Sequence, residues 1–260
     1  MKVASIQTAL ADDLSKADRI AQVERLIDTV AGADLVLLPE VWNLGWYCFD
    51  KYRDSAETLE GETVSRIARK AREINAYILA GSVVEMSGGD LYNTAVMLDR
   101  KGEVIATYRK IHVVHAPGVL EADLLKAGKE PVAIKTDIGV FGFGICYDLR
   151  FPELFRKLAV NHGVEVFLVV AAWPLVRVEN WVEMGHVRAG ENQCYLVSCN
   201  CAGFNRGKQL LGHSGIVDPF GTPIASAGLA GCIVKGEIDI AEVYKVREQF
   251  TALQDRVLSV

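Results

Sequence analysis

Cys146 is the residue of this sequence best placed to act as a nucleophile. It follows the apolar run 139–145 (GVFGFGI) and precedes a helix that we expect at 152–162. A cysteine on a turn between strand and helix presents its sulfur at the edge of a sheet, where the next backbone N–H, that of Tyr147, can stabilise an oxyanion. Most free cysteines are inert core residues, so this segment alone leaves both interpretations open.

A nucleophilic cysteine needs a base, and a histidine or a carboxylate could serve. None of the five histidines has an evident orienting Asn or Asp in its own segment; they stand at positions 112, 115, 162, 186 and 213. Glu40 ends the apolar run LVLLPE, so we expect its carboxylate at the end of a buried strand, where burial would raise its pKa. Lys110 follows another expected strand and could stabilise an oxyanion as an ammonium. In isolation, Glu40 is more typical of a salt-bridged strand end and Lys110 of a solvated surface group.

Hydrophobic periodicity indicates the elements that must position these residues. Apolar runs predict strands at 3–10, 35–40, 77–84, 91–98, 104–108, 132–135, 140–145, 166–171, 194–200, 214–218, 223–227 and 233–240. Helical spacing predicts helices at 14–31, 62–74, 152–162, 178–193 and 241–249. The second half of the chain therefore repeats the strand, helix, strand order of the first half.

Two connections bear on the site. The charged turn DRKG (99–102) is expected to join the strands on either side of it into a hairpin. Residues 111–131 show little periodicity and contain Pro117 and Gly118, which predicts a long irregular segment of the kind that lines binding sites. No linker or change of composition divides the chain. We therefore expect one domain over 1–260 of the α/β class, a four-layer α-β-β-α sandwich with helices outside two stacked sheets.

Composition narrows the class of partner. The chain has 260 residues, half of them hydrophobic, with 28 basic and 33 acidic side chains and a net charge of −5. These values exclude a disordered chain and give no overall basic field for nucleic acid or anionic membranes. The six cysteines are too few for a disulfide scaffold and predict reduced thiols. With no signal peptide or membrane span evident, we expect a cytoplasmic protein that acts on a small molecule.

Three motifs in order resemble the carbon–nitrogen hydrolases, or nitrilase superfamily. They are LLPEVW at 37–42, YRKIH at 108–112 and GICYDLRFPEL at 144–154, supported by AAWPLVR at 171–177, RAGENQCYLVSCNCAGFN at 188–205 and GHSGIVDPFG at 212–221. The resemblance implies that Glu40 is the general base, Lys110 the oxyanion-stabilising cation and Cys146 the nucleophile. The family also uses a second glutamate after the lysine. Glu121 fits that position best, and Asp123 and Glu130 are alternatives.

The resemblance also implies a mechanism and a substrate class. A thioester would form on Cys146 and be hydrolysed, with no metal and no organic cofactor. The motifs are most similar to those of the omega-amidase branch, whose substrates, such as 2-oxoglutaramate, carry an anionic end. Arg150 and Arg177 are the candidate cations for it, although Arg150 could instead pair with Glu153. Trp173 is a candidate for the pocket wall or the core. Trp46 stands near where many relatives place a tyrosine, which could alter the shape of the pocket.

Several alternatives remain open from the sequence. The same three residues could serve an aliphatic amidase, an N-carbamoyl amine hydrolase or a nitrilase, and a more remote alternative is a non-catalytic redox or scaffold protein with this fold. Because relatives commonly associate, we expect a homodimer or a higher homo-oligomer.

Overall fold

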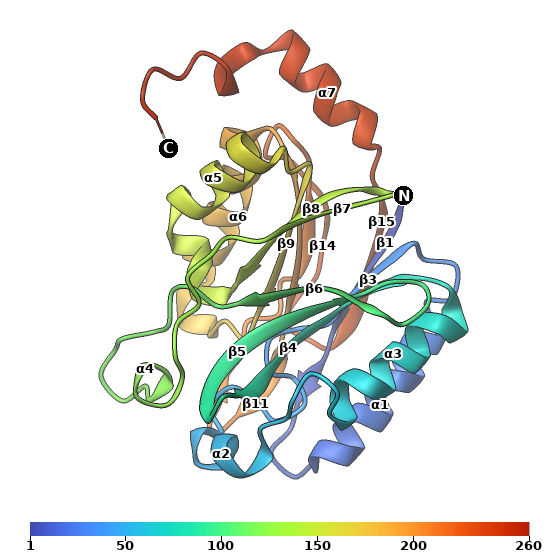
Figure 1. Cartoon of the computed structure of the whole chain (residues 1–260), viewed down its shortest axis with the longest axis vertical. Helices are drawn as coiled ribbons and strands as arrows, with labels where there is room; N and C mark the ends of the chain where they lie inside the picture. The colour runs from blue at the N-terminus through green and yellow to red at the C-terminus, as the bar shows by residue number, and fades with distance from the viewer. Residues whose placement is uncertain (260) are drawn as a thin grey trace.

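Apolar runs form the centres of two six-stranded sheets in the computed structural model, which describes residues 1–259 (Figure 1). The first sheet has the order β15-β1-β3-β4-β5-β6 and contains β1 (Lys2–Gln7), β3 (Leu35–Leu37), β4 (Tyr77–Ser87), β5 (Asp90–Leu98), β6 (Val104–Arg109) and β15 (Cys232–Glu237). The second has the order β14-β13-β10-β9-β8-β7 and contains β7 (Ala133–Thr136), β8 (Gly139–Ile145), β9 (Val166–Ala171), β10 (Tyr195–Asn200), β13 (Gly215–Val217) and β14 (Pro223–Ser226).

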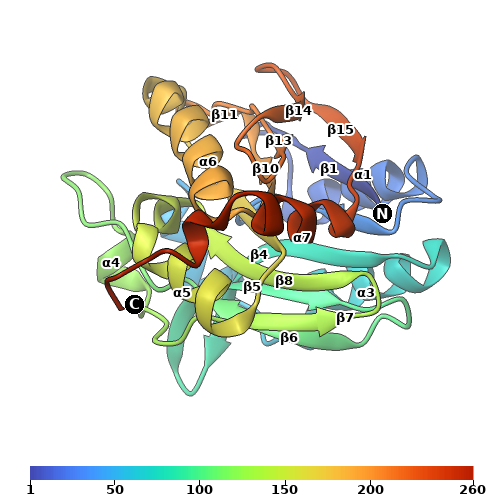
Figure 2. The same ribbon diagram turned by 90° about the horizontal axis from the view of Figure 1, so that it is seen from above.

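Helices cover the outer face of each sheet. On the first sheet lie α1 (Lys16–Asp28) and α3 (Glu62–Ile74), and on the second lie α5 (Pro152–His162) and α6 (Val178–Asn192) (Figures 1 and 2). In α3 the buried Val64, Ile67 and Ala71 recur at helical spacing, so one stripe of this helix faces the sheet. The predicted α-β-β-α sandwich is confirmed.

The strand directions bring several carboxyl ends to one edge of the molecule. β1, β3 and β4 are parallel, as are β8, β9 and β10. The hairpin of β5 and β6 is antiparallel, as predicted, and β5 is antiparallel to β4, so β6 runs in the same direction as β3. The residues that follow β3 and β6 therefore lie at the same edge of the first sheet, and those that follow β8 and β9 lie at the same edge of the second.

Some predicted boundaries are wrong, and backbone chemistry accounts for one of them. The strand expected at 35–40 ends at Leu37 because Pro39 has no N–H to donate to a sheet. Pairing resumes where Glu40 bridges Ser82. Beside it Gly81 has φ +71, and a Cβ there would lie 1.9 Å from the Pro39 carbonyl oxygen, so only glycine allows β4 to approach this closely.

The remaining elements are short or terminal. The strand expected at 3–10 is split into β1 and β2 (Ala9–Leu10), and β2 joins β11 (Ala202–Asn205) and β12 (Lys208–Gln209) in a small third sheet that was not predicted. Two single-turn helices were also not predicted, α2 (Tyr52–Ser55) and α4 (Glu121–Leu124), the latter within the otherwise irregular 111–131 segment. The last α-helix, α7 (Ile240–Gln249), lies beyond the ends of the sheets (Figure 1).

Candidate active site

Glu40, Lys110 and Cys146 meet at the edge where the strands end. Each directly follows a strand or its extension: Glu40 follows β3, Lys110 follows β6 and Cys146 follows β8. All three are buried, with Glu40 0%, Lys110 1% and Cys146 7% exposed. The Glu40 N–H donates to the carbonyl of Ala171 at the end of β9, which joins the two sheets at this point. Three segments distant in the sequence are thus brought together by the parallel strands.

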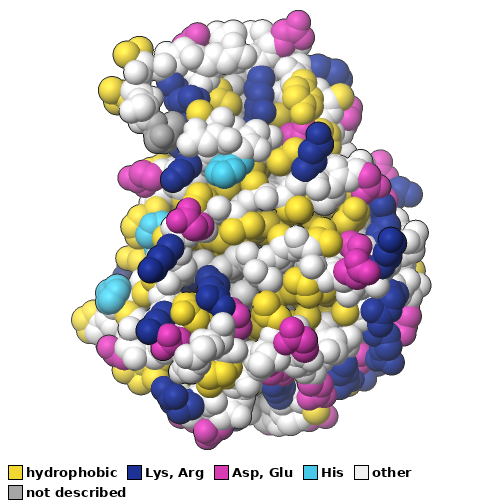
Figure 3. Space-filling model, viewed as in Figure 1, with side chains coloured by type: hydrophobic (Ala, Val, Ile, Leu, Met, Phe, Trp, Pro, Cys, Tyr) yellow, Lys and Arg dark blue, Asp and Glu magenta, His cyan; other side chains and the backbone are white. Residues whose placement is uncertain are grey.

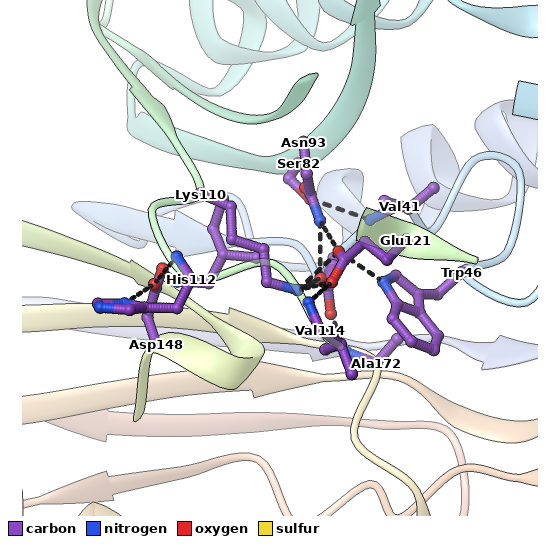
Figure 4. Close-up of polar contacts among 12 residues, drawn as sticks. Val41, Trp46, Ser82, Asn93, Lys110, His112, Val114, Glu121, Asp148 and Ala172 are labelled. Atoms are coloured by element: carbon purple, nitrogen blue, oxygen red, sulfur yellow. Dashed lines mark hydrogen bonds and ion pairs between the residues drawn. The ribbon is translucent and has the colours of Figure 1, made fainter. Parts of the chain in front are cut away.

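The Lys110 ammonium lies between two buried carboxylates (Figure 4). Its Nζ is 3.0 Å from Glu40 Oε1, 2.7 Å from Glu121 Oε1 and 3.0 Å from Glu121 Oε2. Burial lowers the pKa of Lys110, but Glu121 and Glu40 outweigh it and raise that pKa above the usual value. The lysine is therefore a fixed cation whose N–H groups face the two carboxylates.

Glu40 is held on both carboxylate oxygens. Oε1 accepts from Lys110 and from Asn93 Nδ2 at 2.8 Å, and Oε2 accepts from the Ala172 N–H at 2.8 Å. Burial raises the pKa of Glu40 and Glu121 adds to that effect, while Lys110 opposes it. A carboxylate with a raised pKa in a fixed orientation is suited to take up and return a proton.

Cys146 occupies a strained turn. β8 ends at Ile145, and a 3-10 helix spans Cys146–Arg150. Cys146 has φ 48, in the left-handed region, where a side chain costs about 1–2 kcal/mol. Burial raises the pKa of its thiol well above the usual value, and the Glu40 carboxylate raises it further. At neutral pH the thiol is therefore protonated beside a carboxylate.

The same strain recurs beside Glu40. Val41 has φ 43, which is unusual for a β-branched residue, and its N–H donates to the Ser82 carbonyl at 3.0 Å and to Ser82 Oγ at 3.2 Å. Left-handed backbone thus flanks both the carboxylate and the thiol, as is common where a fold fixes functional groups.

Of the three acidic candidates after Lys110, only Glu121 reaches the lysine. It is fully buried on α4, whereas Asp123 and Glu130 are exposed. Its Oε2 accepts from the Val114 N–H at 2.7 Å and its Oε1 from the Trp46 indole N–H at 3.2 Å. Trp46, whose effect on the pocket was expected from the sequence, thus also fixes this carboxylate.

Sequence reasoning missed two groups beside the site. Asn93 and the Ala172 N–H both hold Glu40, and neither carries a local signal, because each acts through position in the fold. His112 does have an acidic partner: its Nδ1 lies 2.8 Å from Asp148 Oδ1, and its N–H donates to the same oxygen at 3.0 Å. Its ring also stacks on Phe151 at 3.6 Å between centroids. The imidazole therefore points away from the Lys110 ammonium and Glu121 (Figure 4).

A pocket of about 920 Å³ opens above Cys146. Its wall includes Trp46, Tyr47 and residues of the 111–131 segment, as expected for that loop. Burial raises the pKa of Tyr47 to about 12, with further contributions from Cys146 and Glu40. Tyr47 therefore stays protonated and lines the pocket as a neutral hydroxyl.

The proposed substrate-binding residues line this pocket together with Tyr147. The Arg150 guanidinium lies 4.7 Å from the ring centroid of the buried Trp173 and 5.8 Å from that of Tyr147. The alternative pairing of Arg150 with Glu153 is wrong, because Arg150 forms no ion pair with any carboxylate of residues 1–259. Arg177 is exposed, and its carbonyl accepts from the Trp173 indole N–H at 2.9 Å.

All six cysteines are free, and among residues 1–259 no cluster of three or more His, Cys, Asp or Glu side chains is arranged to hold a metal ion. No helix in the described chain has both the length and the apolar character needed to span a bilayer. On the face drawn in Figure 3, acidic and basic side chains are interspersed, so that face carries no extended basic field.

Comparison with known proteins supplies independent findings. A family model described as carbon–nitrogen hydrolase matches residues 2–248. A 2-oxoglutaramate amidase of Paenarthrobacter nicotinovorans is 36% identical, over 98% of this chain and 89% of its own length. The enzyme of the same name from Bacillus subtilis (strain 168) is 37% identical, over 86% of this chain and 85% of its own length. An omega-amidase of Homo sapiens is 31% identical, over 93% of this chain and 90% of its own length.

Solved structures agree on the fold. A carbon–nitrogen hydrolase superfamily protein from Xanthomonas campestris, which carries an arsenic adduct in its active site, superposes with a TM-score of 0.92 at 26% identity, covering 100% of this chain and 98% of that one. A Saccharomyces cerevisiae protein of branch 10 of the nitrilase superfamily superposes with a TM-score of 0.87 at 27% identity, covering 99% of this chain and 97% of that one.

Proposed function

The chain belongs to the carbon–nitrogen hydrolase family and is an amidase acting on non-peptide amide bonds, and from this premise we propose its substrate class and mechanism. The proposed reaction is hydrolysis of the terminal amide of a small carboxylate, of the omega-amidase type and with 2-oxoglutaramate as the example, to the acid and ammonia. Relatives named for this activity, at 36% and 37% identity, support the assignment.

One observation carries the mechanism. The fully buried Lys110 ammonium is bonded to Glu40 and Glu121, and Cys146, whose thiol pKa is raised by burial and by Glu40, lines the pocket. Two carboxylates and one cation around a thiol provide a base, a fixed positive charge and a nucleophile in one water-poor site. A purely structural ion pair would not require a thiol on a strained turn beside it.

In the acylation half, Cys146 Sγ bonds to the amide carbon as its proton passes to Glu40. Negative charge then develops on the carbonyl oxygen, where the Lys110 ammonium and the Tyr147 N–H stabilise it. Glu40 returns the proton to the nitrogen, the carbon–nitrogen bond breaks, and ammonia leaves. The product of this half is a thioester on Cys146.

In the deacylation half, a water molecule gives a proton to Glu40 and its oxygen bonds to the thioester carbon. The carbon–sulfur bond breaks, the acid leaves, and the proton returns to the Cys146 sulfur. Glu40 acts twice as base and twice as acid. Glu121 positions Lys110 throughout, because its two oxygens accept from the ammonium and also from Val114 and Trp46.

The charge of the pocket supports an anionic substrate. Within residues 1–259, the Lys and Arg side chains that line it are Arg150, Arg177 and Lys208, and no Asp or Glu lines it. In a chain of net charge −5 this is a local reversal of sign. Arg150 is the preferred partner for a substrate carboxylate, because it is half-buried, stacked on aromatic rings and free of a protein carboxylate.

Arg150→Met is expected to lower kcat/KM for 2-oxoglutaramate roughly 10²-fold, because it removes a charge-assisted hydrogen bond and keeps an unbranched stem on Trp173. Hydrolysis of butanamide, which has no carboxylate, should change by less than about threefold. Arg177→Met is the matched control and should change both rates by less than about threefold, because Arg177 is exposed. Equal losses on both substrates, or a larger loss in the control, would rule out this role for Arg150.

The substrate class is tested by ammonia release from a panel. The unmodified protein should release ammonia fastest from omega-amides that carry a carboxylate, and more slowly from butanamide, a matched nitrile and an N-carbamoyl amine. The N-carbamoyl compound would also yield carbon dioxide. A preference for any uncharged member of the panel would refute the omega-amidase assignment.

A further inference from the structure

The Asn93 side chain contacts both carboxylates of the proposed site. Its Nδ2 lies 2.8 Å from Glu40 Oε1 and 3.3 Å from Glu121 Oε1, and its backbone carbonyl accepts from the backbone N–H of Lys110 at 2.8 Å. The residue lies on β5, 1% exposed (Figure 4). Because Nδ2 faces two carboxylate oxygens, the opposite orientation of the amide would place oxygen against oxygen, so the network fixes the orientation.

The bonding of this amide is one-sided. Asn93 Oδ1 is buried and has no hydrogen-bond partner among the described residues, which is costly for a carbonyl removed from water. If the position served packing alone, an apolar side chain would avoid this cost. The fold instead keeps an amide whose N–H groups all serve the carboxylates of the site.

We propose that Asn93 is a positioning residue that orients Glu40 and stabilises its ionised form, so that it accepts a proton from Cys146 near neutral pH. This inference rests on the proposed function in taking Glu40 as the base. Without the amide, Glu40 Oε1 would keep only its hydrogen bond from Lys110. Glu40 and Glu121 would also lose the N–H donor that they share.

The direction of the effect follows from the groups around Glu40. Those that act on it or are influenced by it are Lys110, Glu121, Cys146, Tyr47, Tyr52 and Cys201. Only Lys110 is a cation among them, and it is unchanged by substitution at Asn93. Removing an N–H donor from a carboxylate raises the pKa of that carboxylate. The acid limb of activity, set by ionisation of the base in the free enzyme, should therefore move to higher pH.

Two variants and one control test this. Asn93→Leu removes the donors at similar size, and Asn93→Asp replaces them with a third carboxylate. The control is Asn192→Leu, because Asn192 is also a buried asparagine with an unpartnered Oδ1, but its Nδ2 donates to the Arg188 carbonyl within α6. Each protein is measured for kcat/KM against pH. Each is also measured for the rate of Cys146 alkylation by iodoacetamide against pH, by peptide mass spectrometry, which requires no substrate.

In both measurements, the midpoint pH of the acid limb should be about one unit higher in Asn93→Leu than in the wild type, and higher still in Asn93→Asp. Asn192→Leu should keep the wild-type limb even if its thermal stability falls. The inference is overturned if the Asn93 variants keep the wild-type limb, or if the control shifts as far. If Asn93→Leu does not fold, Asn93→Asp decides alone. If the wild type hydrolyses no amide and yet the alkylation limb shifts, the proposed substrate is wrong and the role of Asn93 is supported.

Discussion

Cys146→Ala is expected to lower kcat for omega-amide hydrolysis at least about 10⁴-fold, because no other group of the site can form the thioester. The protein should remain folded, since alanine is smaller and does not worsen the left-handed backbone at this position. Ammonia release under saturating substrate, with circular dichroism to verify folding, measures the effect.

Cys194→Ala is the matched control for this loss. Cys194 is fully buried, precedes β10 and lies outside the pocket, and its sulfur accepts from Arg247 on α7. The variant should therefore stay within about twofold of wild-type activity at a modest cost in stability. Retention of more than about one hundredth of wild-type activity in Cys146→Ala would contradict a nucleophilic role.

Glu40→Gln is expected to lower kcat at least about 10³-fold, because a neutral amide can neither accept nor return a proton at this position. The same change should nevertheless make the Cys146 thiol easier to ionise. The Glu40 carboxylate raises the pKa of Cys146, and Lys110 lowers it. Removing the carboxylate while keeping the lysine must therefore lower the pKa of Cys146.

Alkylation of Cys146 against pH separates these two effects. In the wild type, the alkylation rate should increase twice with pH. The first increase occurs as Glu40 loses its proton, and the second occurs at high pH as the Cys146 thiol itself ionises. Glu40→Gln should lose the first rise and show the second at lower pH than in the wild type. Glu130→Gln, an exposed glutamate, is the control and should change neither rise. An unchanged thiolate rise, or turnover within about tenfold of wild type, would show that Glu40 is not the base.

The layers of this fold could be predicted because its central elements satisfy local rules. The stripe of α3 and the continuous apolar run of β9 define elements whose predicted bounds agree with the structure. The short strands β11 and β12 depend on tertiary contacts. β11 and β12 pair with each other and with β2, and stretches of two to four residues carry too little periodicity to be identified.

Part of the site could also be predicted from the sequence. The resemblance pointed to Glu40, Lys110 and Cys146, and the structure brings them together. It also distinguishes Glu121 from Asp123 and Glu130, which the loose spacing after Lys110 did not allow. The contacts of Asn93 and the pairing of His112 with Asp148 join segments that are 53 and 36 positions apart, so they emerge only once the strands are arranged.

The claim of a thioester on Cys146 is tested most directly by mass spectrometry of the wild-type protein quenched in acid during turnover of an omega-amide. The account predicts that the peptide containing Cys146 gains the mass of the substrate less ammonia, and that hydroxylamine added during turnover yields the hydroxamate of the same acyl group. An adduct on another residue, or ammonia release at full rate with neither adduct nor hydroxamate, would contradict it.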